Sequence, residues 1–129
     1  MIYLDTSVAL AQILAEDRSP PELLWKEELI SSRLLEYETW TRLNARGLGS
    51  SHGDAARALL AEVAFLELTP QTLARALEPF PAPVRTLDAL HLASADYLRK
   101  QGQNIRLATY DERLLAGARK MGIEIYPLL

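Results

Sequence analysis

The chain has 129 residues, no cysteine and a formal net charge of −3 at pH 7. This length fits a single domain over residues 1–129 that buries an ordinary core without metal or disulfide support. The lack of cysteine excludes disulfides, zinc–thiolate sites and cysteine nucleophiles, and the acidic balance excludes a strongly basic domain whose overall field attracts nucleic acid. Because Asp5 interrupts the first apolar run, residues 1–18 match neither a signal peptide nor a membrane span, and the cytoplasm is the expected location.

The N-terminal half of the chain alternates apolar runs with helical spacings. Residues 1–4 form an apolar run that predicts a buried strand, and the apolar residues from Val8 to Leu14 recur at helical spacing. Ser19-Pro20-Pro21-Glu22 has capping-box spacing with proline at the first helical position. In chain order, the expected elements are a strand at 1–4, a helix to 14, a helix at about 20–28, a strand at 29–32, and helices at 34–46 and 51–62.

The C-terminal half continues this alternation around a proline-rich segment. Residues 79–85, PFPAPVR, cannot form a regular helix and predict a surface loop. The expected elements are a strand at 63–68, a helix at 69–78, the loop, a long helix at 86–101, a strand at 105–109, a helix at 111–120 and a strand at 123–126. This order predicts an α/β fold with right-handed crossovers and a mainly parallel sheet covered by helices on both faces.

Four acidic residues are expected near one edge of this sheet, where ligands bind at the carboxyl ends of parallel strands. Asp5 closes the first strand, Asp111 follows the strand at 105–109, and Glu38 and Asp88 lie in the first turns of long helices. Two carboxylates about 4 Å apart repel by roughly 4 kcal/mol at an effective dielectric near 20, so a cluster of four needs protonation or a cation. Oxygen ligands favour Mg²⁺ or Mn²⁺ over zinc.

Each acid also has a structural interpretation. Asp5 and Asp111 stand where aspartate commonly caps a helix, and for Asp111 taken alone the capping role is favoured. Glu38 shares its segment with Glu36, and the spacing does not show which of the two faces a site. Asp88 precedes a mostly apolar stretch of small residues and therefore borders a buried surface, which favours a functional role.

Four polar residues accompany these acids. Thr6, Ser7 and Thr109 carry hydroxyl groups beside the two strand-end aspartates, where they cap helices or orient carboxylates and water. His91 follows Asp88 by three positions and so lies on nearly the same helical face. It either contacts a substrate phosphate or satisfies a hydrogen bond in the core, and the core role is favoured.

Four segments that together span nearly the whole chain carry a family resemblance. They are LDTSV at 4–8, SSRLLEYE at 31–38, TLDALHLASA at 86–95 and ATYDERLLAGARKMGIEIYPL at 108–128. The chain resembles the PIN-domain nucleases, in particular the VapC-type toxins of toxin–antitoxin pairs. The resemblance implies a three-layer α/β/α fold with a five-stranded parallel sheet, and an acidic quartet of Asp5, Glu38, Asp88 and Asp111. Glu38 is preferred to Glu36 because the family's acid lies six residues after a serine like Ser32.

The resemblance also implies an activity, a cofactor and partners. The activity is endonucleolytic cleavage of RNA, often transfer or ribosomal RNA, by water that Mg²⁺ or Mn²⁺ activates, which leaves a 5′-phosphate and a 3′-hydroxyl. Asp5, Asp88 and Asp111 are the implied metal ligands, and Glu38 is a ligand or an orienter of the water. The family further implies a homodimer and a small antitoxin whose tail covers the acidic groove. Candidate RNA contacts around the site are Arg33, Arg42, Arg46, Arg85 and Arg113.

Other functional classes fit less well. A phosphoryl-transfer enzyme of the haloacid-dehalogenase type needs a second aspartate two residues after Asp5, where this chain has Ser7. A phosphorelay receiver domain needs a lysine near the end of its fifth strand, whereas all three lysines fall in predicted helices. The remaining alternative is a catalytically inactive PIN-like module that binds RNA or a protein partner, and the four intact acids disfavour it.

Overall fold

The computed structural model describes residues 1–128 and is built on a five-stranded sheet. The strands are β1 (Ile2–Leu4), β2 (Leu29–Ser32), β3 (Val63–Leu66), β4 (Arg106–Ala108) and β5 (Glu124–Ile125). They stand in the order β3-β2-β1-β4-β5, and every neighbouring pair is parallel. The chain moves outward from β1 to β3 and then returns to β4 on the other side, so the strand order switches between β1 and β4.

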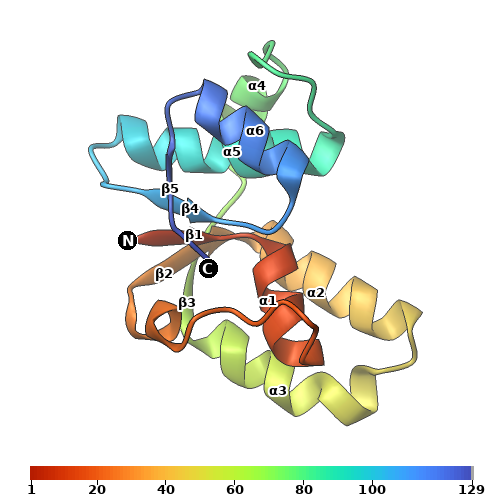
Figure 1. The fold of residues 1–129 in the computed structure, drawn as a ribbon. Helices are drawn as coiled ribbons and strands as arrows, with labels where there is room; N and C mark the ends of the chain where they lie inside the picture. Colours follow the sequence, from red (N-terminus) through yellow and green to blue (C-terminus); the bar gives the residue numbers. More distant parts are fainter. Residues whose placement is uncertain (129) are drawn as a thin grey trace.

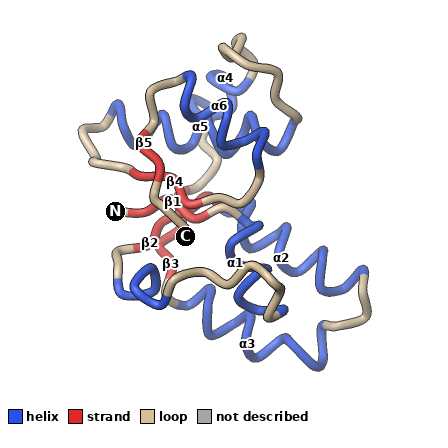
Figure 2. Tube along the Cα trace, in the orientation of Figure 1, coloured by secondary structure: helices blue, strands red, loops and turns tan. Residues whose placement is uncertain are grey.

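Helices cover both faces of the sheet, which confirms the expected three-layer α/β/α fold (Figure 1). On one side lie α1 (Thr6–Leu14), α2 (Arg33–Ala45) and α3 (Gly49–Ala61), which contact one another. On the other side lie α5 (Thr86–Lys100) and α6 (Glu112–Lys120), with α4 (Pro70–Ala76) packed on α5. Figure 2 shows the strands as a layer between these two groups of helices. Among the described residues, none of the helices combines the length and the apolar character that crossing a bilayer requires.

The buried strand β1 explains why the first residues read as a continuous apolar run. Successive side chains of a strand point to opposite faces. Ile2 and Leu4 therefore pack in the core cluster on the side of α1 and α2, and Tyr3 packs in the cluster on the side of α5 and α6. All three side chains have no exposed surface, as expected for a central parallel strand covered on both faces.

Several predicted boundaries differ from the observed ones. The helix expected at 20–28 is only a short 3-10 helix, η1 (Glu22–Lys26), because Pro21 disfavours a helical conformation at residue 20 and Pro21 itself is extended, with φ −60° and ψ 140°. The strands expected at 63–68, 105–109 and 123–126 are each shorter. The loop expected at 79–85 does lack helix and strand. Leu129, the end of the expected domain 1–129, lies outside the described residues.

Candidate functional site

A cavity of about 310 Å³ brings the four expected acids together. It lies where β1 and β4 end, at the switch in strand order, which is the position expected for a ligand in an open parallel sheet. Its lining also includes three of the four polar residues expected there, together with two arginines. The lining residues are Asp5, Thr6, Ser7, Glu38, Arg42, Arg85, Thr86, Leu87, Asp88, His91 and Asp111.

Asp5 is held at the end of β1 by three hydrogen bonds to a single carboxylate oxygen. Its Oδ2 accepts from the Ser7 amide at 3.2 Å, the Ser7 hydroxyl at 2.6 Å and the Thr109 hydroxyl at 2.8 Å. Its backbone N–H donates to the carbonyl of Ala108 at 3.0 Å, which fixes Asp5 beside β4. Asp5 therefore both caps α1 and lines the cavity.

Asp111 is positioned in a similar way at the start of α6. Its Oδ1 accepts from the backbone amides of Arg113 and Leu114 at 2.9 and 3.2 Å. Its own amide donates to the hydroxyl of Thr109 at 2.9 Å. Although Thr109 does not line the cavity, its hydroxyl joins Asp5 to Asp111 and sets the relative position of the two strand-end acids.

Asp88 lies in the first turn of α5 and is buried, with 9% of its surface exposed. Its Oδ2 accepts a long hydrogen bond of 3.4 Å from the backbone amide of Arg85. Burial and the negative charge of Asp111, with a smaller effect from Asp5, raise the pKa of Asp88 above its ordinary value despite this hydrogen bond. The carboxylates of the cavity are thus close enough to repel one another.

Glu38 is fixed by a chain of buried hydrogen bonds that crosses the sheet. Its Oε1 accepts from the Thr6 hydroxyl at 3.1 Å and lies 2.7 Å from His91 Nε2. His91 Nδ1 lies 2.8 Å from the Tyr3 hydroxyl, which in turn accepts from the Ser32 amide at 3.3 Å. His91 is 2% exposed, so the favoured core role agrees with its burial.

The same contacts determine the charge of His91. Burial lowers the pKa of the imidazole, but the Tyr3 hydroxyl, the hydrogen bond with Glu38 and the charge of Asp5 outweigh burial. The pKa of His91 therefore lies well above its ordinary value. Its Nε2 is 3.9 Å from Asp5 Oδ1, so the imidazole stands between two of the acids.

Glu38 and Glu36 have different surroundings in the structure. Glu38 is buried in the second turn of α2, one turn later than expected from the sequence, and faces the cavity. Glu36 is half exposed and pairs with Arg33 at 3.5 Å. Since Glu36 does not line the cavity, the preference for Glu38 is consistent with the geometry.

The donor set of this cavity fits a hard divalent cation. Within residues 1–128, each acid receives its hydrogen bonds on only one oxygen: Oδ2 of Asp5, Oε1 of Glu38, Oδ2 of Asp88 and Oδ1 of Asp111. The second oxygen of each accepts no hydrogen bond within these residues, although Asp5 Oδ1 lies 3.9 Å from His91 Nε2. Oxygen-only ligands suit Mg²⁺ or Mn²⁺. Within residues 1–128, however, no three acidic or histidine side chains are already arranged to hold an ion, so the cavity matches a divalent cation in donor chemistry and not as a preformed ligand shell.

The expected ring of arginines is only partly correct. Arg42 and Arg85 line the cavity, and Arg113 lines a neighbouring one. Arg33 instead pairs with Glu67 at 2.9 Å, and Arg46 directly follows α2 without lining either cavity.

The sequence reasoning missed Tyr3, which it treated only as part of an apolar strand. A tyrosine in a buried strand is itself a signal, because a buried hydroxyl needs a hydrogen-bond partner. Local spacing does not reveal that this partner is His91, which lies 88 positions away.

Comparison with known proteins gives the family. The model of the PIN domain matches residues 2–120. Ribonuclease VapC47 of Mycobacterium tuberculosis (strain CDC 1551 / Oshkosh) is 33% identical over 129 residues, which cover 95% of this chain and 93% of the relative. Ribonuclease VapC46 of Mycobacterium tuberculosis (strain ATCC 25618 / H37Rv) is 33% identical over 128 residues, which cover 96% of this chain and 95% of the relative.

A solved structure shows the same fold. It is VapC20 of Mycobacterium tuberculosis, a toxin that cleaves the sarcin–ricin loop, with a TM-score of 0.66 and 24% sequence identity over 98% of this chain and 100% of that one. The match to the PIN model extends over most of the chain, and the two VapC relatives match it over nearly their full lengths. The chain belongs to the PIN-domain family and, within it, to the VapC proteins.

Proposed function

We propose that this protein is a metal-dependent endoribonuclease and the toxin of a toxin–antitoxin pair. It cleaves RNA phosphodiesters and leaves a 5′-phosphate and a 3′-hydroxyl. The observation that carries this proposal is the cavity in which four carboxylates meet, each with one oxygen held by hydrogen bonds and one oxygen uncommitted. Membership of the VapC proteins and the ribonuclease names of two relatives support it.

The proposed cofactor is Mg²⁺ or Mn²⁺. Asp5, Asp88 and Asp111 would hold the ion through their uncommitted oxygens, and Glu38 either completes the ligand set or orients the attacking water. The bound ion supplies positive charge that offsets the acids and the phosphate and lowers the pKa of the attacking water.

The protein's own contribution is to hold these groups in position before the substrate arrives. The Thr109 hydroxyl sets Asp5 and Asp111 relative to one another. Thr6 and His91 hold Glu38 through the oxygen that does not serve the reaction. Fixing the carboxylates in this way removes reorganisation that the reaction would otherwise require. The neighbouring Arg42 and Arg85 are cations at the same cavity and suit contact with substrate phosphates.

The partners we propose follow from the VapC membership. They are a cognate antitoxin that covers the acidic groove, a second copy of the chain in a homodimer, and an RNA substrate in the cytoplasm. A basic side chain of the antitoxin would compete with the metal for the four carboxylates, because both are attracted by the same negative charge.

The test is cleavage of RNA by the purified protein, freed of any bound partner. Total RNA is incubated with Mg²⁺ or Mn²⁺, with and without chelator, and new RNA ends are mapped. Asp5→Asn removes one proposed ligand, and Asp54→Asn on the remote helix α3 is the matched control. Discrete cuts that need metal, persist in Asp54→Asn and vanish in Asp5→Asn are the expected result. If neither metal supports cleavage, the nuclease proposal is wrong, and the protein is instead a module that only binds RNA or a protein.

A further inference from the structure

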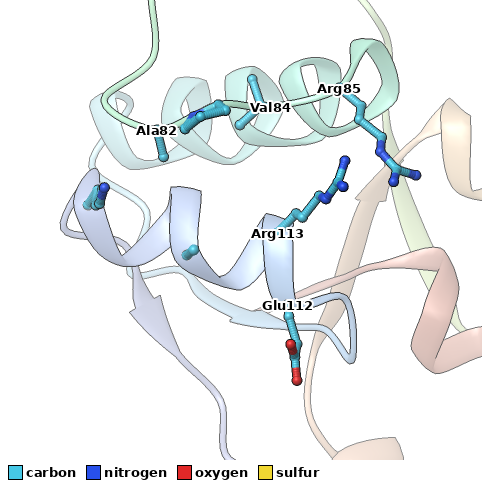
Figure 3. A pocket seen from close by; sticks show the side chains of 8 residues that line it. Ala82, Val84, Arg85, Glu112 and Arg113 are labelled. Carbon is cyan, nitrogen blue, oxygen red and sulfur yellow. The ribbon is translucent and has the colours of Figure 1, made fainter.

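A second cavity, of about 550 Å³, lies beside the acidic one, between the proline-rich loop and α6 (Figure 3). Its apolar lining comes from Ala82, Pro83, Val84 and Ala116, and its charged lining from Arg85, Glu112, Arg113 and Lys120. Arg85 lines both cavities, so the second cavity continues the first along the surface. We call it the loop–α6 cavity.

Two arginines stand at the end of the loop–α6 cavity that adjoins the acids. Arg85 precedes Asp88 by three positions, and Arg113 follows Asp111 by two. Figure 3 shows both side chains extending toward the same side of the cavity, whereas Glu112 points away from them. In the described part of the chain, neither guanidinium is within ion-pair distance of a carboxylate.

Local stability disfavours both of these positions for a cation. Arg85 is the N-cap of α5, where a side-chain oxygen is preferred, and its guanidinium has no acceptor to offer. Arg113 lies in the first turn of α6, where the helix dipole favours acids and opposes cations. Two like charges that extend to one place also repel each other. Departures from local preference of this kind are expected where a ligand supplies the compensating interaction.

We propose that the loop–α6 cavity binds a nucleotide of single-stranded RNA next to the scissile phosphate. The guanidinium groups of Arg85 and Arg113 bind its phosphate, and its ribose and base pack against the apolar lining. Lys120, two helical turns after Arg113 on α6, is positioned for a further phosphate. This inference rests on the proposed ribonuclease function and names the path that the substrate strand takes away from the acids.

The chemistry of the cavity favours this occupant. Arginine binds phosphate through two parallel hydrogen bonds, and paired unpartnered arginines attract an anion. The volume lies in the range of pockets that enclose one small ligand. An unpaired strand can turn its bases onto an apolar surface, which a stacked duplex cannot do.

The experiment measures RNA binding without cleavage. A fluorescein-labelled single-stranded RNA is titrated with protein in excess chelator, and anisotropy is followed at several salt concentrations. The wild type is compared with the double variant Arg85→Gln/Arg113→Gln and with Lys26→Gln/Arg57→Gln, which removes the same number of positive charges from residues that line neither cavity. We expect Arg85→Gln/Arg113→Gln to bind roughly tenfold more weakly or worse, the size of a missing charge-assisted hydrogen bond, with Lys26→Gln/Arg57→Gln unchanged. The salt dependence, as the slope of log K against log salt, should fall by about 0.7 for each phosphate that an arginine no longer neutralises.

Two results would overturn the proposal. One is equal RNA affinity and equal salt dependence in the wild type and the double variant. The other is a labelled oligoglutamate that binds the wild type as tightly as RNA and fails to bind the double variant, which would make the cavity a site for an acidic protein segment. Because chelator is present throughout, arginine-dependent RNA binding supports this site even if the cleavage experiment fails, so the two proposals fail separately.

Discussion

Replacing Tyr3 by phenylalanine tests the buried chain of hydrogen bonds that positions Glu38. Tyr3 has no exposed surface, and its hydroxyl bonds to His91 Nδ1 at 2.8 Å and accepts from the Ser32 amide at 3.3 Å. Phenylalanine fills nearly the same volume without the hydroxyl. The substitution therefore removes these two hydrogen bonds and leaves the apolar packing of β1 in place.

The magnitude follows from the groups left without a partner. His91 Nδ1 and the Ser32 amide both become buried and unsatisfied, and each such group costs about 1–3 kcal/mol. We expect the free energy of unfolding to fall by about 3 kcal/mol. Unfolding entropy scales as about 2.1 cal/mol/K per residue, so in a chain of 129 residues this loss lowers the melting temperature by about 10 °C.

The assay is thermal unfolding followed by circular dichroism, with Tyr110→Phe as the control. The Tyr110 hydroxyl is also buried but has no hydrogen-bond partner among residues 1–128, so its removal should leave stability unchanged or slightly raised. If the two variants melt at the same temperature, the hydrogen-bond chain does not contribute as we describe.

Three further predictions use other parts of the molecule. Burial opposes ionisation of Asp96, but hydrogen bonds from Lys100 and Arg99 lower its pKa. The contribution of Asp96 to stability is therefore present above its unfolded pKa and is lost as pH falls through its folded pKa. The free energy of unfolding of Asp96→Asn, measured with urea, should be about 2 kcal/mol lower at pH 7 and should depend less on pH in the acid range. Burial and neighbouring acids raise the pKa of Asp88, so the stability of the metal-free protein should fall as pH rises through that pKa, and calorimetry should find Asp88→Asn more stable at neutral pH. Gly117→Ala places a Cβ 3.0 Å from a leucine methyl group, and this overpacking should outweigh the roughly 1 kcal/mol that alanine gains over glycine inside a helix, so we expect a net loss of about 1 kcal/mol in the same urea assay. An unchanged or raised midpoint would show that the neighbouring side chain gives way at little cost.

The fold was largely predictable because short apolar strand signals alternate with helical spacings along the chain and the strand β1 is buried on both faces. The run at residues 1–4 indicated a buried strand, which is confirmed, and Asp5 at its end lines the cavity that the four acids share. The helix expected at 20–28 was wrong because the proline after Ser19 suits the first position of a helix, whereas the second proline, Pro21, disfavours a helical conformation at the residue before it. Hydrophobic period thus indicated the type of the other elements, and their errors are limited to the ends of strands and helices.

The site was predictable in composition but not in its supporting contacts. Parallel strands end at one edge of a sheet, so the convergence of Asp5 and Asp111 followed from topology. The pairing of Tyr3 with His91 joins residues 88 positions apart, and no local period encodes such a contact. Arg33 was expected near the acids, but its helix turns it toward Glu67, which shows that charge type alone does not place a side chain.

The central claim is that the four acids hold a divalent cation through their uncommitted oxygens. Crystals of the protein grown with Mn²⁺ test it directly, because the anomalous scattering of manganese locates the ion without assumption. We predict an anomalous peak among Asp5, Asp88 and Asp111, at about 2.0–2.2 Å from at least one uncommitted carboxylate oxygen. An empty cavity at saturating Mn²⁺, or a peak only at another surface, would contradict the claim.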